Sequence, residues 1–215
     1  MVNLKRIILD SAAGYNLFDL IIGKFGYSRA KLFAKYCPYT PGMRVLDLGC
    51  GPGTATKFFK EDDYLGIDTS SEYIEVAKKR YPLHNFRCSD FGETHEELNR
   101  EYGSFDIVVA MGLLHHIDDQ TAQRYISCCR KILKPGGVLV TFDGCIYEGQ
   151  SKVRRKVVMS DRGKFIRKKH EYFTLFDKQG FTVRGSIEEE VLLIPHTMLA
   201  ITARVNLNDA SRGEA

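Results

Sequence analysis

A short apolar segment that runs directly into closely spaced glycines is the feature that most constrains this chain. Residues 45–54 read V-L-D-L-G-C-G-P-G-T, and Asp68 ends the next apolar run. Glycines permit positive φ angles and let a ligand approach the backbone, and a helix that follows them offers unpaired N–H groups. An acid at the end of the next strand can accept hydrogen bonds from a ribose diol. The pattern predicts a strand-turn-helix pocket for a nucleoside.

The glycine spacing differs from that of a dinucleotide-binding loop. Gly49, Gly51 and Gly53 follow a G-x-G-x-G pattern instead of G-x-G-x-x-G, and Asp47 stands two residues before the first of them. A carboxylate at that position would oppose a pyrophosphate and would suit a cationic ligand.

Together with G-I-D at residues 66–68, this run resembles the first two motifs of class I S-adenosylmethionine (SAM) dependent methyltransferases. The resemblance implies that the glycine loop holds the methionine and ribose parts of SAM, that Asp68 takes the ribose hydroxyls, and that Asp90 and Phe91 line the adenine. An aspartate that closes a strand is also a common N-cap, which leaves Asp90 a second interpretation. The expected cofactor contacts are Tyr15, Asp47, Gly49, Cys50, Gly51, Gly53, Asp68, Thr69, Asp90, Phe91 and Met111.

Strand-like and helix-like segments alternate from about residue 43 onward, which predicts an α/β fold with a mostly parallel sheet and helices on both faces. The resemblance implies a Rossmann-like, doubly wound, seven-stranded sheet with an antiparallel edge strand. The expected strands are Arg44–Leu48, Tyr64–Asp68, Asn85–Ser89, Phe105–Met111, Val138–Asp143, Phe181–Ile187 and His196–Val205. Helices are expected to start within Thr54–Phe59, to run from Ser70 or Ser71 to Arg80, and to cover Thr121–Leu133 and His170–Gln179.

Residues 1–42 precede this alternation and do not read as a strand-helix unit. Their apolar spacing predicts two amphipathic helices separated at Gly23–Gly26. These helices either extend the core or form a cap over the cofactor, with Tyr15 as the candidate contact. We therefore expect a helical cap at 1–42 and a methyltransferase domain at 43–206 that together form one globular unit.

The composition is that of a soluble globular domain. The chain has 215 residues, 44% of them hydrophobic, with a mild net charge of +4. We find neither an apolar run of the roughly 20 residues that a membrane span needs nor a signal-peptide pattern. The six cysteines form no C-x-x-C pair, which predicts reduced thiols and a cytoplasmic location.

Two adjacent histidines follow the fourth expected strand, in the run A-M-G-L-L-H-H-I-D at 110–118. Ligands bind at the carboxyl ends of strands in such sheets, and a histidine there can act as general base toward a hydroxyl. His115 and His116 are therefore candidate catalytic residues, although the first histidine of such a pair can also serve packing alone. Asp143, which closes the fifth expected strand at the same edge, is a third candidate, with a helix cap as its alternative.

The segment 152–169 carries nine lysines and arginines against one acid, Asp161. Such a cluster can hold an anionic substrate, an acidic membrane surface or a nucleic-acid backbone. It can equally be a solvated amphipathic helix that turns Val153, Val157, Val158 and Phe165 inward. The run D-R-G-x-x-x-R resembles a stretch in some small-molecule methyltransferases, which makes Arg162 and Arg167, together with Tyr147, candidate acceptor contacts.

The sequence thus favours a SAM-dependent methyltransferase that acts on a small molecule, with an anionic acceptor compatible with the basic segment. The accepting atom can be a hydroxyl oxygen, an amine or a carbon, and the positive sulfonium requires no metal. Alternatives are an RNA or protein methyltransferase that uses residues 152–169, or a SAM-binding module without methyl transfer, including a cyclase. Nucleic acid is disfavoured because the sequence shows no recognisable RNA-binding module and no N-P-P-Y-type tetrapeptide after the fourth expected strand.

Overall fold

The structure is a computed structural model that describes residues 27–190, 192 and 194–206. Helix α3 (Tyr27–Tyr36) matches the second of the two helices expected before the sheet. The first of those helices, and with it the candidate contact Tyr15, lies outside the described residues.

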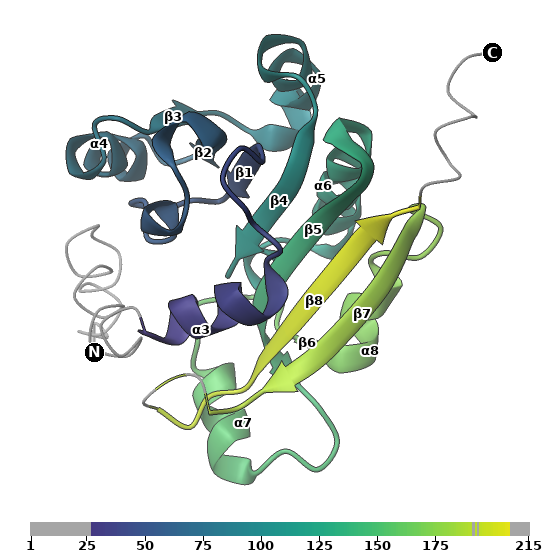
Figure 1. Ribbon diagram of the computed structural model, residues 1–215. Helices are drawn as coiled ribbons and strands as arrows, with labels where there is room; N and C mark the ends of the chain where they lie inside the picture. Colours follow the sequence, from purple (N-terminus) through teal and green to yellow (C-terminus); the bar gives the residue numbers. More distant parts are fainter. Residues whose placement is uncertain (1–26, 191, 193, 207–215) are drawn as a thin grey trace.

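A single mixed sheet forms the centre of the molecule (Figure 1), with the strand order β3-β2-β1-β4-β5-β8-β7. The first five strands in this order are parallel, and β8 is antiparallel to both of its neighbours, as expected for a doubly wound sheet with an antiparallel edge. A two-residue strand, β6 (Arg167–Lys168), adds to the carboxyl end of β5. The other strands are β1 (Val45–Leu48), β2 (Tyr64–Asp68), β3 (Asn85–Cys88), β4 (Phe105–Met111), β5 (Leu133–Ile146), β7 (Phe181–Glu188) and β8 (Met198–Val205).

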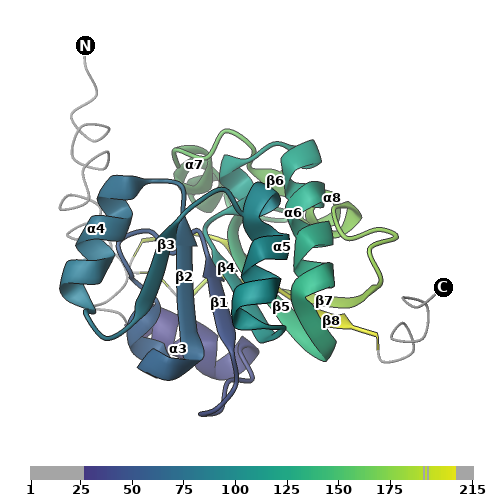
Figure 2. The same cartoon turned by 90° about the horizontal axis from the view of Figure 1, so that it is seen from above.

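Helices cover both faces of this sheet (Figure 2). The described helices after α3 are α4 (Ser71–Arg80), α5 (Phe91–Tyr102), α6 (Asp119–Ile132), α7 (Lys152–Met159) and α8 (Lys169–Thr174). Residues of α5, α6 and α8 share one hydrophobic cluster with the sheet, and residues of α3 and α4 share the other. Among these described helices, none has the length and apolarity needed to cross a membrane.

Helix α5 is an element that the sequence expectations did not include. Its residues Phe91, His95 and Leu98 are buried and lie four and three positions apart, so they form one stripe that faces the core. The other positions of the helix are mostly polar, which makes the apolar stripe narrow and the sequence signal weak.

Most expected elements differ from the structure by one to three residues at an end, and three differ more strongly. The glycine loop leads into a short 3-10 helix, Thr56–Phe58, instead of an α-helix, because Phe59 turns inward and packs edge-on against Phe33. Helix α8 ends at Thr174, short of Gln179. Strand β5 begins at Leu133, so the K-P-G-G run at 134–137 lies within a strand whose register against β4 shifts at that point.

Candidate active site

The glycine loop leaves β1 at the carboxyl end of the parallel strands. Gly49, Gly51 and Gly53 have φ angles of +71°, +54° and +78°, a region that side-chain-bearing residues rarely adopt. A Cβ atom added at Gly51 would meet no heavy atom within 4 Å, so the backbone there faces open space. The loop therefore offers the close approach to the main chain that a nucleoside ligand needs.

Asp68 lies directly beside this loop, as the sequence predicts. Its carboxylate accepts one hydrogen bond from the Gly51 N–H at 2.9 Å and another from the Ser70 N–H at 2.9 Å. Asp68 is half-buried and its neighbour Thr69 is exposed. The ends of β1 and β2 thus bring an acid and an open glycine backbone together at one edge of the sheet.

Asp47 and Cys50 point into the protein. Asp47 accepts a hydrogen bond of 2.7 Å from the buried Tyr64 hydroxyl, which in turn accepts one from Thr56. The thiol of Cys50 lies in the apolar core, where burial raises its pKa well above the usual value. A role for Cys50 in cofactor binding is therefore limited to its main chain.

Asp90 is the N-cap of α5, since its carboxylate accepts a hydrogen bond of 2.7 Å from the Gly92 N–H. The ring of Phe91 is buried in the core, with an edge-on contact to Tyr125. The N-cap interpretation of Asp90 is thus confirmed, whereas an adenine contact by Asp90, Phe91 or the half-buried Met111 stays a prediction.

His115 lies just after β4, between Asp143 of β5 and Asp161 of the loop that follows α7. Its Nδ1 is 2.9 Å from Asp143 Oδ1, and its Nε2 is 3.3 Å from Asp161 Oδ1. The main-chain N–H of His115 also donates to Asp143 Oδ1 at 3.2 Å. Asp143 is only 1% exposed and His115 only 6%, whereas the next residue, His116, is exposed.

These surroundings shift the pKa values of both histidines in opposite directions. Burial alone would lower the pKa of His115, but its hydrogen bonds to Asp143 and Asp161 outweigh burial and raise the pKa to about 9. Burial and the neighbouring charge of His115 lower the pKa of His116 to about 4. At neutral pH, His115 therefore holds its proton and His116 is neutral.

This geometry argues against proton transfer by two of the candidate bases, whose catalytic roles stay predictions. His115 has a carboxylate oxygen beside each ring nitrogen, so no ring nitrogen is left open to a substrate in this arrangement. Asp143 lies inside β5 instead of closing it, and it contacts the histidine instead of open space. Such a contact fixes the tautomer and orientation of a histidine ring. Of the three expected catalytic side chains, only His116 is exposed.

Arg167 also differs from expectation, because it anchors the chain instead of facing an acceptor. It is 5% exposed, and it donates four hydrogen bonds of 3.1 Å or less and forms an ion pair with Asp119. These acceptors are the carbonyl oxygens of Leu114, Phe165 and Ile117 and the carboxylate of Asp119. Arg167 thereby ties the end of the basic segment to the loop that carries the two histidines. Arg162 is exposed and stays a predicted acceptor contact.

The basic segment is only partly the inward-facing helix that was considered as an alternative. Val158 of α7 is fully buried, but Val153 is 62% exposed and Phe165 is 38% exposed. The expectation that all four apolar residues turn inward is therefore wrong for these two.

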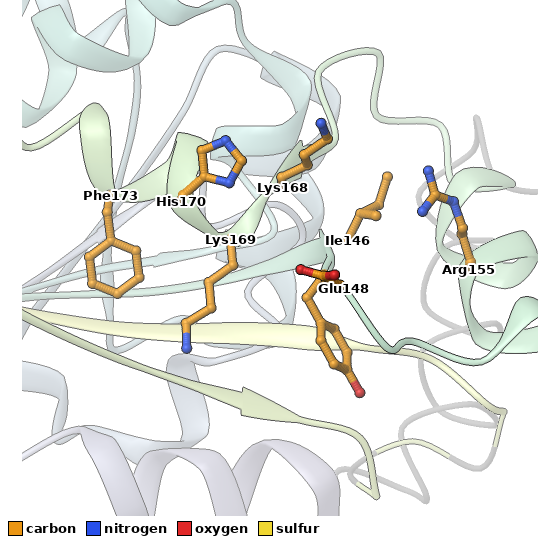
Figure 3. A pocket seen from close by; sticks show the side chains of 8 residues that line it. Ile146, Glu148, Arg155, Lys168, Lys169, His170 and Phe173 are labelled. Carbon is orange, nitrogen blue, oxygen red and sulfur yellow. The ribbon is translucent and has the colours of Figure 1, made fainter.

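A hollow of about 790 Å³ lies at the carboxyl end of β5, next to α8 (Figure 3). Among the predicted acceptor contacts, Tyr147 lines it, and no residue of the glycine loop does. Its lining residues are Ile146, Tyr147, Glu148, Arg155, Lys168, Lys169, His170 and Phe173. Three permanent cations against one acid make this a positively charged hollow with an apolar floor.

Comparison with known proteins finds a match over the part of the chain that contains the glycine loop. Residues 45–137 match the family model described as a methyltransferase domain. This part of the chain is therefore similar to a methyltransferase domain, and the strand order around it is that of a doubly wound sheet. The matched range contains the glycine loop, Asp68, Asp90 and both histidines of the site, and it ends within β5.

Individual relatives agree with this methyltransferase domain. The chain is 36% identical over 104 residues to a protein named ubiquinone biosynthesis O-methyltransferase from Coxiella burnetii, a match that covers 46% of this chain but only 42% of that protein. A SAM-dependent methyltransferase from Archaeoglobus fulgidus superposes with a TM-score of 0.66 at 19% identity, covering 88% of this chain and 99% of the other. Phosphoethanolamine N-methyltransferase 2 from Haemonchus contortus gives 0.68 at 18% identity, covering 95% and 60%.

Asp161 and Gly163 are parts of the site that sequence reasoning missed. Both belong to the D-R-G-x-x-x-R run, from which only Arg162 and Arg167 were predicted as contacts, and nothing in the sequence links either residue to His115. A Cβ atom at Gly163 would lie 2.2 Å from His115 Cδ2 and 2.7 Å from the His115 carbonyl oxygen. Only glycine can bring the loop this close to the methyltransferase domain's histidine.

Gly163→Ala is therefore expected to displace the loop that carries Asp161. Because His115 is held by Asp143, the ring cannot move away, and the overpacking should cost about 1–3 kcal/mol of unfolding free energy. Urea unfolding measures this loss. Gly149→Ala is the matched control, since a Cβ atom there meets nothing within 4 Å, although its φ of +87° carries its own strain. Equal stability of Gly163→Ala and wild type would contradict the close packing.

Proposed function

We propose that this chain is an enzyme that transfers a methyl group from SAM to a small-molecule acceptor. The observation that carries the proposal is the methyltransferase domain at 45–137, which encloses the open glycine loop and the adjacent Asp68. The chain spans less than half the length of the curated relatives it matches, so the acceptor of those proteins is not transferred to this one.

The residues around the glycine loop fit SAM. The backbone at Gly51 is unobstructed, and Asp68 offers carboxylate oxygens at its side for a ribose diol. We propose Gly49, Gly51, Gly53, Asp68 and Thr69 as the core of the cofactor site. Bound SAM would supply an electrophilic methyl carbon attached to a positively charged sulfur, and Asp47 behind the loop adds a negative charge that suits such a cation.

The chain contributes orientation more than proton transfer. Proton transfer is most efficient when the pKa of the base lies near the working pH, and His116, with a pKa of about 4, is a weak base. A neutral, exposed imidazole can still accept a hydrogen bond from an acceptor hydroxyl and orient it. Much of the rate would then come from holding donor and acceptor in line and from excluding water.

The positively charged hollow supports an anionic acceptor. Arg155, Lys168 and Lys169 line it together with the predicted acceptor contact Tyr147. The apolar side chain of Ile146 would contact the body of such a molecule, and the three cations would bind its charged group. Within the described residues no cysteine is paired, which agrees with a reducing compartment, and we propose the cytoplasm.

The double variant K168E/K169E tests the anionic acceptor. Each exposed charge pair is worth about 1 kcal/mol or less, so reversing both charges should lower kcat/KM for carboxylate- or phosphate-bearing acceptors by about tenfold. Neutral acceptors should be used as before. Lys152→Glu changes an exposed lysine outside the hollow and serves as the control. An equal effect on charged and neutral acceptors would contradict the assignment.

Incubation with SAM labelled in its methyl group tests the proposed function itself. The enzyme is mixed with a panel of phenols, amines and carboxylic acids, and separately with RNA and protein. We expect label in a small product, and at a limiting concentration of SAM that label should be reduced in Asp68→Ala. Label in a polymer that falls steeply with added salt would point to the RNA or protein alternative, and binding without any labelled product would point to a module without methyl transfer.

A further inference from the structure

Three side chains at the acceptor edge of the sheet converge on one point. His115, His116 and Asp161 each present one ligand atom, and these atoms all lie within 4.8 Å of one another. The rings of the two histidines are 4.2 Å apart between centroids. Two imidazoles and one carboxylate form a donor set that first-row transition metals bind in proteins.

Asp143 supports His115 in the way that a carboxylate supports a metal-binding histidine. A metal-binding histidine usually donates its other ring N–H to a carboxylate, which fixes the tautomer and aims the free nitrogen at the metal. Here Nδ1 of His115 faces the fully buried Asp143 at 2.9 Å, so Nε2 is the nitrogen that faces Asp161. The buried Asp143 is an observation separate from the cluster, because the positions of His115, His116 and Asp161 do not require an acid behind His115.

The loop that carries Asp161 is held against His115. Phe165 N–H donates to the His115 carbonyl oxygen at 3.0 Å, and Gly163 N–H donates to Asp161 Oδ1 at 2.8 Å. Arg167 then fastens the end of the loop to the histidine-bearing segment. The position of Asp161 relative to His115 is therefore fixed by several separate bonds, which is what a preformed ligand set needs.

We propose that His115, His116 and Asp161 bind a divalent transition-metal ion, for which Zn²⁺ is the test ion. The ion would take the place of the proton on His115 Nε2, which is released to solvent, while the Nδ1 proton stays with Asp143. Bonds from Zn²⁺ to imidazole nitrogen and carboxylate oxygen measure about 2.0–2.2 Å, so two ligand atoms of a tetrahedral site lie roughly 3.3–3.6 Å apart. The 3.3 Å between His115 Nε2 and Asp161 Oδ1 matches this separation. The ligand atom of His116 lies within 4.8 Å of the other two. Because the His116 side chain is exposed, its ring can rotate to shorten this separation.

Three protein ligands leave one of four positions open, as in catalytic zinc sites. Water would fill that position, or an oxygen of the acceptor. The second possibility rests on the proposed function, because it assigns the metal the task of orienting the acceptor and lowering the pKa of its hydroxyl. The binding site itself does not depend on that role.

Zinc titration of chelator-treated full-length protein tests the site. Isothermal titration calorimetry is run at neutral pH in a Cys88→Ser background, which removes the exposed thiol. We expect one Zn²⁺ per chain and an affinity at least tenfold lower in His116→Ala and in Asp161→Asn. Both replaced side chains are exposed, so these variants should fold, and circular dichroism checks that they do. His170→Ala, which removes an exposed histidine elsewhere, should bind as before.

Co²⁺ provides a second measurement on the same samples. Cobalt bound with low coordination number absorbs strongly in the visible range, and this band should vanish in His116→Ala. No saturable binding, or an affinity in either ligand variant within threefold of the background protein, would overturn the proposal and leave His115 as an ion-paired histidine. Binding of S-adenosylhomocysteine is measured in parallel. Its absence would refute the proposed function without affecting the zinc result, and a failed zinc titration with intact nucleoside binding refutes only the metal site.

Discussion

Asp68→Ala is expected to weaken the binding of S-adenosylhomocysteine by about 5- to 150-fold, equivalent to roughly 1–3 kcal/mol. The substitution removes the carboxylate proposed to accept from the ribose hydroxyls. It also removes the acceptor of the Gly51 and Ser70 N–H groups, which hold the glycine loop beside β2. Both losses act in the same direction. Isothermal titration calorimetry with S-adenosylhomocysteine measures the change without knowledge of the acceptor.

Asp62→Ala is the matched control for this experiment. Asp62 is an exposed acid on the short 3-10 helix before β2, and its removal should leave the affinity unchanged. A dissociation constant for Asp68→Ala equal to that of wild type would refute the assignment of Asp68 to the ribose.

Arg167→Ala should lower the unfolding free energy by about 3–5 kcal/mol, the range observed when one partner of a buried ionic network is removed. The variant leaves the carbonyl oxygens of Leu114 and Ile117 without their donors in a buried region. It also releases β6 from the start of α6, where Asp119 lies. Urea denaturation followed by circular dichroism gives the difference in midpoint.

Two further variants separate the anchor from a general effect of charge. Arg155→Ala removes an exposed arginine and is expected to change stability by less than about 0.5 kcal/mol. Arg167→Lys keeps the charge but cannot supply five N–H donors, so its stability should be closer to that of alanine than to that of arginine. Wild-type stability of Arg167→Lys would show that the hydrogen-bond geometry matters little.

The sequence predicted the fold well because its signals are local. Apolar runs such as Phe105–Met111 are buried on both faces and have one plausible structure, and the structure has that strand with the same bounds. The glycine loop and Asp68 could be joined because a strand-turn-helix unit brings such positions together by its topology alone. Helix α5 escaped notice because its apolar stripe is too narrow to stand out.

The candidate site was predicted in its location but not in its contacts. The interaction of His115 with Asp161 joins residues from different loops, and its existence depends on a glycine and an arginine that hold the second loop in place. The spacing of residues in the sequence does not show that these two loops come together. For the same reason Arg167 was predicted to contact the acceptor, although the folded chain buries it among carbonyl groups that no motif reveals.

The short pairing of β5 with β6 determines how easily the segment between these two strands can change in length. Cys145 pairs with Arg167, so the two ends of the intervening segment are neighbours in space. Lengthening a loop whose ends are already adjacent costs little, roughly 0.6 kcal/mol for each doubling of length. Residues 147–166 can therefore change in length at little cost to the sheet. An exchange of the whole segment would also replace Asp161 and Gly163, so the contacts of His115 depend on which residues the new segment carries.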